Sequence, residues 1–175
     1  MDKLILIDRN DNIIGSFGKT LTHKKGILHR AVSVYIINSE GKILLQQRAK
    51  NKYHSGGLWS NTCCTHPRPG EEIMSAAKRR LKEEMGIECN LLSLFPLYYN
   101  VDVGNGFREH EITHVFYGVC SDIPVLNPEE AASFSYTSPD NIIHEIKKHP
   151  EKFTEWFKFC FPEIIIHTFN FTKLR

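Results

Sequence analysis

The sequence predicts one α+β domain over residues 1–175, in which a mixed or mainly antiparallel β-sheet core is flanked by helices. The length is close to the roughly 150 residues of a typical domain. A content of 41% hydrophobic and 24% charged residues is that of an ordinary globular protein. Short apolar runs rich in Val and Ile alternate with tight turns, which is typical of paired strands. One central segment has apolar residues at helical spacing followed by a glycine.

The N-terminal part is expected to contribute strands and one polar loop. Residues 4–8 and 13–17 are apolar runs separated by an Asp-Asn turn, which predicts a short hairpin. The polar composition of residues 19–29 predicts a loop. Two strands rich in Val, Ile and Leu are expected over residues 31–38 and 42–48, joined by a tight turn.

The middle of the chain predicts a loop, a short strand and the clearest helix. Residues 49–57 are polar and end in two glycines, so we expect a loop there, and residues 58–65 predict a short strand. A helix is expected from about Glu72 to Met85, because its apolar residues recur at helical spacing. Gly86 follows at the position where a glycine commonly ends a helix.

The C-terminal part predicts a hairpin followed by helices. Residues 91–103 and 111–120 are expected to be strands around a Gly-Asn-Gly turn. Pro162 is expected to end or kink the last helix, because proline lacks the N–H that the helix interior needs. The remaining expected elements are a short strand over residues 133–138 and helices over residues 141–149 and 151–171.

Composition and charge exclude several functions. Twenty-two Lys and Arg against 20 Asp and Glu give a net charge of +2, which disfavours a protein that coats nucleic acid or an anionic membrane. A local basic patch for a small anionic substrate remains compatible with this balance. No apolar run approaches the roughly 18 residues of a membrane span, and the first apolar run is too short for a signal peptide. Five cysteines do not form a disulfide framework. We expect a cytoplasmic monomer.

Cys64 and His66 are two residues apart at a predicted strand, so their side chains should point to one side. A thiol tuned to near neutrality can act as an acid, a base or a nucleophile. The alternative is that Cys64 is a buried, chemically inert side chain, as many free cysteines are.

Glu109 and Glu111 are also two residues apart on a predicted strand. Two carboxylates about 6.6 Å apart on one inward face repel each other and are costly to bury. A metal ion or a shared proton would make the arrangement favourable. The alternative is an edge strand whose charges are solvated.

His23 and His29 lie in the predicted polar loop, where histidines often serve only as polar surface. Together with His66 and the two glutamates they would supply three imidazoles and two carboxylates. This mixture suits Zn²⁺, Mn²⁺ or iron, and its carboxylates also admit Mg²⁺.

Arg80 and Glu84 are four residues apart on one face of the predicted helix. They form either an ordinary surface ion pair or a phosphate site. In the second case Glu84 would hold Mg²⁺, and Arg80 would contact phosphate oxygens through its planar guanidinium.

The segment around this helix resembles the Nudix superfamily, whose box has the form G-x5-E-x7-R-E-U-x-E-E-x-G-U with U aliphatic. Thr65 replaces the first glycine, and Arg80 replaces a glutamate that helps to hold the catalytic metal ions in Nudix hydrolases. The second departure disfavours hydrolysis of that type. The box positions that match are Glu71, Arg79, Leu81, Glu83, Glu84, Gly86 and Ile87.

Further motifs over residues 19–171 resemble the type I isopentenyl-diphosphate isomerases, a branch of that superfamily. NTCCTHP combined with EHE is the most specific match, and ILHRAVSVYIIN, LLQQR and TEWFKF accompany it. The resemblance implies a Nudix-like fold. It also implies reversible isomerisation of isopentenyl diphosphate to dimethylallyl diphosphate in isoprenoid biosynthesis.

The resemblance implies a role for each matching residue. Cys64 and Glu111 match the catalytic cysteine and glutamate, Tyr99 matches a tyrosine near that glutamate, and Trp156 matches the tryptophan that faces the reacting carbons. One divalent ion, Mn²⁺, Mg²⁺ or Zn²⁺, would be held by His23, His29, His66, Glu109 and Glu111. A substrate-linked Mg²⁺ would be held by Glu84, and the diphosphate would be contacted by Lys19, Arg48, Lys52 and Arg80.

The implied reaction needs an acid and a base on opposite faces of the substrate, with dry aromatic walls around a cationic intermediate. Glu111, aided by Tyr99, would protonate the alkene, and Cys64 would remove the allylic proton. Trp156 would offer its π-face to the positive charge. Two alternatives remain: a Nudix pyrophosphohydrolase of a nucleoside diphosphate derivative, and a non-catalytic binding module stabilised by metal.

Overall fold

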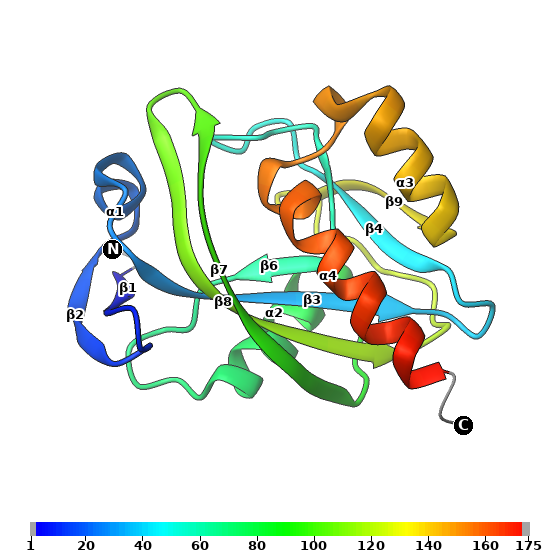
Figure 1. Cartoon of the computed structure of the whole chain (residues 1–175), viewed down its shortest axis with the longest axis horizontal. Helices are drawn as coiled ribbons and strands as arrows, with labels where there is room; N and C mark the ends of the chain where they lie inside the picture. The colour runs from blue at the N-terminus through cyan, green and yellow to red at the C-terminus, as the bar shows by residue number, and fades with distance from the viewer. Residues whose placement is uncertain (1–2, 173–175) are drawn as a thin grey trace.

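The strands pair into one mixed sheet with β3 at its centre (Figure 1). The computed structural model describes residues 3–172, with side chains described to residue 167. The elements in chain order are β1 (Lys3–Ile7), β2 (Ile13–Gly18), α1 (Lys19–Lys25), β3 (His29–Ile37), β4 (Ile43–Arg48), β5 (Trp59–Ser60), β6 (Cys63–Thr65), α2 (Ile73–Met85), β7 (Leu91–Gly104), β8 (Phe107–Val119), β9 (Ala131–Thr137), α3 (Pro139–Lys148), the short 3₁₀ helix η1 (Pro150–Lys152) and α4 (Glu155–Thr172). The predicted α+β class with a mixed sheet and flanking helices is confirmed.

The central strand β3 is paired along both edges. On one edge it runs parallel to β8, from the pair His29 and Glu111 to the pair Ile37 and Val119. On the other edge it pairs in turn with β1, β6 and β4, all antiparallel. A strand covered on both faces needs apolar residues at successive positions, which explains the nearly continuous apolar run of β3.

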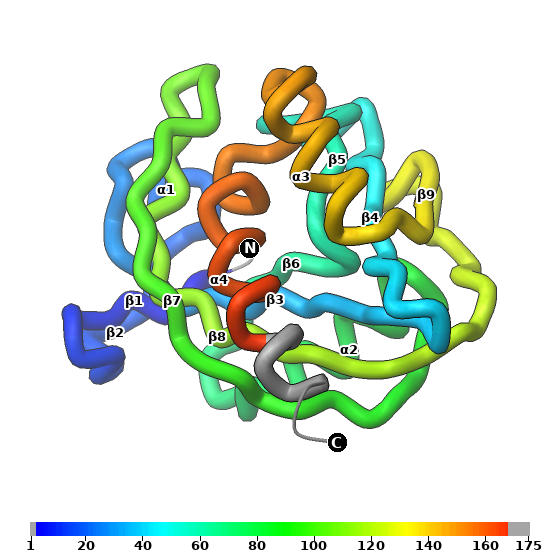
Figure 2. The backbone as a smooth tube through the Cα atoms, turned by 45° about the vertical axis from the view of Figure 1, so that its right-hand side comes forward, coloured from blue at the N-terminus to red at the C-terminus, as the bar shows by residue number. Residues whose placement is uncertain are grey.

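Successive β3 side chains point to opposite faces of the sheet. A helix covers each face, α2 one and α4 the other (Figures 1 and 2). Val34 packs with Leu81 of α2 in one buried cluster. Tyr35 packs with Phe157 and Phe161 of α4 in a second cluster on the other face. Full burial of a side chain of this size stabilises the fold by about 1.5–3 kcal/mol. The two clusters therefore fix α2 and α4 against the sheet.

The predicted loop over residues 19–29 is wrong in its first part, because Lys19–Lys25 form the helix α1. The helix ends at Gly26, which adopts the left-handed conformation with φ of 60°. Thr22 and His23 are fully buried where α1 packs on β8. The polar composition did not predict this helix, because its buried side chains are those of Thr22 and His23 rather than apolar ones.

The predicted strand over residues 58–65 is two short strands, β5 and β6, which pair with different neighbours. β5 pairs with β4, and β6 pairs with β3. Thr62 lies between them, where its Oγ1 accepts a hydrogen bond from the backbone N–H of Ile36 and donates one to the carbonyl of Leu44. The side chain thus joins β3 and β4 at the point where the chain crosses between them.

Pro162 does not end α4, contrary to the expectation that it could. The helix continues to Thr172, and Pro162 itself lies on the exposed side. Phe161 and Ile164, on either side of it, are buried against the sheet. This packing compensates for the one backbone hydrogen bond that proline cannot make. Among the described residues, no helix has the length and apolarity needed to cross a membrane.

Candidate functional site

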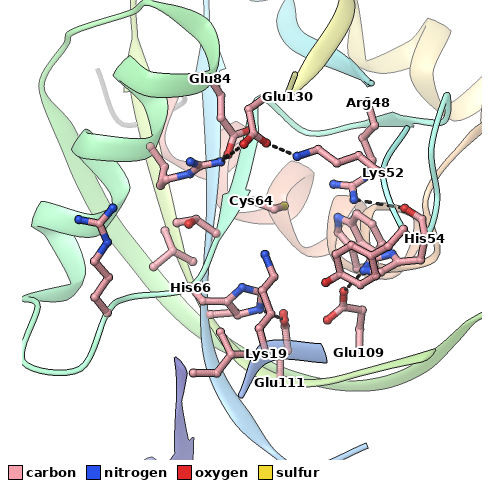
Figure 3. Close-up of a pocket in the computed structure, with 18 of the residues that line it drawn as sticks. Lys19, Arg48, Lys52, His54, Cys64, His66, Glu84, Glu109, Glu111 and Glu130 are labelled. Atoms are coloured by element: carbon pink, nitrogen blue, oxygen red, sulfur yellow. Dashed lines mark hydrogen bonds and ion pairs between the residues drawn. The ribbon is translucent and has the colours of Figure 1, made fainter. Parts of the chain in front are cut away.

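A cavity of about 460 Å³ is lined by residues of α1, β6, β8, α2, α4 and the 49–57 loop (Figure 3). Nearly all of the residues predicted for the site from the sequence line this cavity. His23 and His29 do not line it, and both are fully buried next to lining residues. The fold therefore gathers the predicted residues in one place, although they come from most of the length of the chain.

The predicted metal ligands converge. One donor atom from each of the five residues lies within 4.8 Å of all the others. The parallel register sets part of this geometry, because His29 of β3 is directly level with Glu111 of β8. The members of the cluster are His23 on α1, His29 on β3, His66 directly after β6, and Glu109 and Glu111 on β8.

Two of the histidines are already oriented for metal binding. Nδ1 of His23 lies 2.8 Å from the carbonyl oxygen of Lys19, and Nδ1 of His29 lies 2.8 Å from that of Ile27. A carbonyl only accepts hydrogen bonds, so each Nδ1 must carry the proton. In the neutral rings, each Nε2 then carries a lone pair, which is the form that binds metal.

The centre of the cluster contains polar atoms without hydrogen-bond partners. Nε2 of His23, Nε2 of His29 and Oε2 of Glu109 are buried and make no hydrogen bond. Nε2 of His23 nevertheless lies 3.2 Å from Oε2 of Glu109. A lone pair and a carboxylate at this distance repel each other unless a proton or a metal ion lies between them, and Glu109 accordingly raises the pKa of His23 against the effect of burial. The cluster thus fits one metal ion, with the mixed nitrogen and oxygen ligands that divalent transition metals accept.

Cys64 is held by polar side chains on the face of the sheet that α4 covers. Its Sγ lies 3.0 Å from Oδ1 of Asn61, to which the thiol donates, and 3.6 Å from Oγ of Ser33. Burial raises the pKa of the Cys64 thiol to about 12. Its neighbour Cys63 faces the core under α2, as expected from the alternation of the strand.

Glu111 lies across β3 from Cys64, since β8 and β6 pair with opposite edges of that strand. Burial alone would raise the pKa of Glu111, but the adjacent imidazole of His29 and the hydrogen bond from the Tyr99 hydroxyl hold it at about 2. Burial also raises the pKa of Tyr99 well above its ordinary value. Tyr99 therefore remains protonated and donates a hydrogen bond to Oε2 of Glu111.

Trp156 forms an aromatic wall of the cavity at the start of α4. Its Nε1–H donates to Oγ of Ser60 over 3.0 Å, which fixes the orientation of the indole. The guanidinium carbon of Arg48 lies 5.1 Å from the indole ring. Glu155 is the first residue of α4, and its side chain is exposed.

Positive side chains gather at the cavity with only partial neutralisation. Arg80 donates to Oε1 of Glu84 over 2.7 Å and lies 3.0 Å from Oε1 of Glu130. The other oxygen of Glu130 pairs with the ammonium of Lys52 (Figure 3). Glu84 is buried and accepts a further hydrogen bond from Gln46 over 2.9 Å. Lys19 and Arg48 also line the cavity.

Among the polar cavity residues that sequence reasoning missed, His54 and Glu130 form ion pairs with predicted site residues. His54 lies in the polar 49–57 loop and is 3% exposed, with Nε2 3.1 Å from Oε1 of Glu109. Glu130 lies directly before β9 and belongs to no motif. For neither residue does the sequence carry a signal of its place in the site, since Tyr53, the aromatic neighbour of His54, is itself exposed.

Comparison with known proteins identifies the family. A family model for the NUDIX domain matches residues 27–157. The isopentenyl-diphosphate Delta-isomerase of Pectobacterium atrosepticum is 51% identical over 94% of this chain and 92% of its own length. The isopentenyl-diphosphate Delta-isomerase 2 of Aromatoleum aromaticum is 46% identical over 94% of this chain and 87% of its own length.

Solved structures support the fold. The protein DR0079 from Deinococcus radiodurans superposes with a TM-score of 0.71 over 85% of this chain and 90% of that chain, at 18% identity. The MutT protein from Methanosarcina mazei superposes with a TM-score of 0.63 over 78% of this chain and 91% of that chain, at 22% identity. The sequence relatives then distinguish the branch: the chain belongs to the isopentenyl-diphosphate Delta-isomerase family within the NUDIX family.

Proposed function

We propose that this protein interconverts isopentenyl diphosphate and dimethylallyl diphosphate by moving a proton on and a proton off the substrate. The observation that carries the proposal is the placement of Cys64 and Glu111 at one cavity, on strands that flank β3. Relatives that share 51% and 46% identity over nearly the whole chain bear the name of this isomerase.

Cys64 and Glu111 are proposed as the two proton-transfer groups. Glu111, assisted by Tyr99, protonates the terminal alkene carbon, and Cys64 removes the allylic proton, so that the double bond shifts by one position. In the reverse direction the two roles exchange. Trp156 shields the cationic intermediate from water and presents its π-face, an interaction of about 2 kcal/mol in a desolvated site.

The protonation states of Cys64 and Glu111 in the free chain match those expected after one forward turnover. With the Cys64 pKa at about 12 and the Glu111 pKa at about 2, the free chain holds a thiol and a carboxylate. This is the state left after the forward reaction, and the state from which the reverse reaction starts. A forward turnover therefore begins once the proton has moved to Glu111.

The diphosphate is proposed to bind where Lys19, Arg48, Lys52 and Arg80 line the cavity. Glu84 would hold a Mg²⁺ ion linked to the substrate. The cluster of His23, His29, His66, Glu109 and Glu111 would hold one Mn²⁺, Mg²⁺ or Zn²⁺ ion. When bound, these ions supply positive charge beside the diphosphate and beside Glu111. We also propose that the enzyme works as a cytoplasmic monomer in isoprenoid biosynthesis.

The test is an NMR time course of isopentenyl diphosphate with the metal-loaded protein in D₂O. Dimethylallyl diphosphate containing deuterium is the expected product. Cys64→Ala should lower turnover by about 10²- to 10⁴-fold, the usual contribution of a general acid or base. Cys63→Ala, in the core cluster under α2, is the matched control and should retain turnover.

Two outcomes would overturn the proposal. Release of phosphate from a panel of nucleoside diphosphate derivatives, without isomerisation, would identify a pyrophosphohydrolase instead. Absence of turnover on every substrate, with metal bound and the chain folded, would identify a metal-stabilised binding module.

A further inference from the structure

His54 is a buried histidine that neither the predicted metal cluster nor the proposed reaction uses. It is 3% exposed and lies among aromatic rings, with the Tyr53 ring 4.4 Å and the Trp156 ring 5.8 Å away between centroids. Figure 3 shows it beside Glu109 at the cavity. A buried imidazole requires a polar partner, and the identity of that partner indicates its role.

The imidazole has two polar neighbours: Nδ1 lies 3.3 Å from Oγ of the adjacent Ser55, and Nε2 faces the outer oxygen of Glu109. Nε2 of His54 lies 3.1 Å from Oε1 of Glu109, whereas Oε2 of the same carboxylate faces Nε2 of His23 at 3.2 Å. A carboxylate oxygen at Glu109 only accepts, so the proton lies on Nε2 of His54. Oε1 of Glu109 therefore contacts His54, and Oε2 points to the centre of the cluster.

Backbone hydrogen bonds hold the 49–57 loop, which carries His54, in one conformation. Arg48 N–H donates to the carbonyl of Leu58 over 2.9 Å, and Gly57 N–H donates to the carbonyl of Arg48 over 3.1 Å, which closes the base of the loop. A Cβ on Gly56 would lie 2.5 Å from the carbonyl oxygen of Lys50, so the tight path of the loop requires glycine there. A side chain on such a loop can hold its partner in a defined position.

We propose that His54 is a positioning residue that fixes the Glu109 carboxylate for metal binding. This inference rests on the proposed metal site, and it gives a role there to a residue that is not one of the five ligands. Glu109 needs this contact because Glu111, two residues away on β8, repels it. The same loop carries Lys52 and begins directly after Arg48 at the end of β4, so the contact between His54 and Glu109 links the segment with these proposed diphosphate cations to the metal centre.

Metal affinity tests the proposal without reference to turnover. The affinity for Mn²⁺ is measured by competition with a chelator for the wild type, His54→Leu and His54→Gln. Loss of a hydrogen bond that orients a ligand typically costs 10- to 100-fold in metal affinity, and we expect this for His54→Leu. His54→Gln retains an N–H donor near the position of Nε2 and should restore affinity to within about threefold of wild type.

His114→Leu is the matched control, since His114 lies on β8 but binds Asp11 over 2.8 Å and does not line the cavity. It should bind Mn²⁺ as the wild type does. His54→Asn, a smaller polar variant that cannot reach Glu109, gives the same expected loss as His54→Leu if the latter fails to fold.

The outcomes separate this inference from the proposed function. Wild-type affinity in folded His54→Leu or His54→Asn would overturn the positioning role and leave the five-ligand site intact. Equal loss in His54→Leu and His54→Gln would make His54 a direct ligand, which also overturns the inference. No Mn²⁺ binding by the wild type would overturn both the site and the role of His54.

Discussion

Tyr99 and Glu111 lie directly opposite each other in the β7–β8 hairpin, and the Tyr99 hydroxyl donates a hydrogen bond to Oε2 of Glu111. Both side chains are buried, at 3% and 4% exposure. Because strand register determines which residues are opposite, the hairpin itself places the phenol on the proposed catalytic carboxylate. The remaining oxygen of Glu111 faces His29 and His66, at 3.1 Å and 2.8 Å.

Tyr99→Phe should lower kcat with little change in KM. The variant removes a hydrogen bond to a charged group, worth about 1.5–3 kcal/mol, which corresponds to roughly a 10- to 100-fold loss of rate. The substrate diphosphate does not contact this position in the proposed site, so KM should be nearly unchanged. Steady-state kinetics with isopentenyl diphosphate measure both parameters.

Tyr98→Phe is the control for this prediction. Tyr98 is adjacent on β7, and its hydroxyl lies 3.1 Å from Nε2 of His110 rather than at the cavity. Equal losses of kcat in the two variants would show that the effect comes from the hairpin and not from the contact with Glu111.

Glu130→Gln should weaken binding of inorganic pyrophosphate about tenfold. Removal of a negative charge near an anion site would by itself strengthen anion binding. Glu130 also holds the Lys52 ammonium and the Arg80 guanidinium in place. Without Glu130, Arg80 keeps its ion pairs with Glu83 and Glu84 of its own helix. We expect the loss of this orientation to outweigh the charge effect.

Isothermal titration with pyrophosphate measures this balance. Glu129→Gln, which alters an exposed carboxylate one residue away, removes the same charge and should not weaken binding. Tighter binding of pyrophosphate by Glu130→Gln than by wild type would contradict the prediction and identify Glu130 as a competing anion.

Removal of the metal should destabilise the fold. An ion present at about 100 times its dissociation constant stabilises the folded state by about 2.7 kcal/mol, or roughly 5–10 °C in Tm for a chain of this size. Chelation should therefore lower Tm, and readdition of Mn²⁺ should restore it. His66→Ala should lack the ion in elemental analysis, and a full equivalent of metal in that variant would contradict the five-ligand site.

Glu71 should contribute stability that disappears in acid. The hydrogen bonds from Arg79, at 2.6 Å and 2.8 Å, hold the pKa of Glu71 below its ordinary value of 4.5. A carboxyl with a depressed pKa stabilises the folded state above pH 4.5 and loses this contribution as the pH falls through its folded-state pKa. Glu71→Gln should therefore be about 1 kcal/mol less stable than wild type at pH 7, with the difference shrinking at acid pH.

Urea unfolding across this pH range tests the prediction. Glu88→Gln is the control, since Glu88 pairs with Lys82 on the surface, where the two side chains are 71% and 63% exposed. Its stability difference from wild type should be near zero throughout. A constant gap between Glu71→Gln and wild type from neutral to acid pH would contradict the proposed linkage.

Local pattern predicted most of the fold, and pattern together with the family resemblance predicted most of the residues that line the cavity. Residues two apart on a strand share a face, so the spacing of Glu109 and Glu111 was sufficient to place them together. Helical spacing and Gly86 located α2 almost to the residue. The convergence of the ligands did not follow from spacing, because it depends on the pairing of β3 with β8.

The features that were missed depend on tertiary contacts. The helix α1 is buried through polar side chains, and no apolar periodicity marks it. His54 and Glu130 acquire partners only when separate segments meet, as Glu130 does with Lys52 and Arg80. The pairing of β4 with β9 likewise joins segments far apart in the chain.

The parallel register of β3 and β8 also determines when the metal site can exist during folding. His29 is level with Glu111, yet β4, β5, β6, α2 and β7 all lie between them in the chain. Contacts of such long range form late, because the entropy of closing a long loop must be paid first. A chain that has not yet docked β8 holds the histidines without their glutamates. An ion at the proposed site would therefore gain its full set of ligands only in the completed sheet, and it would stabilise that state over the partly folded ones.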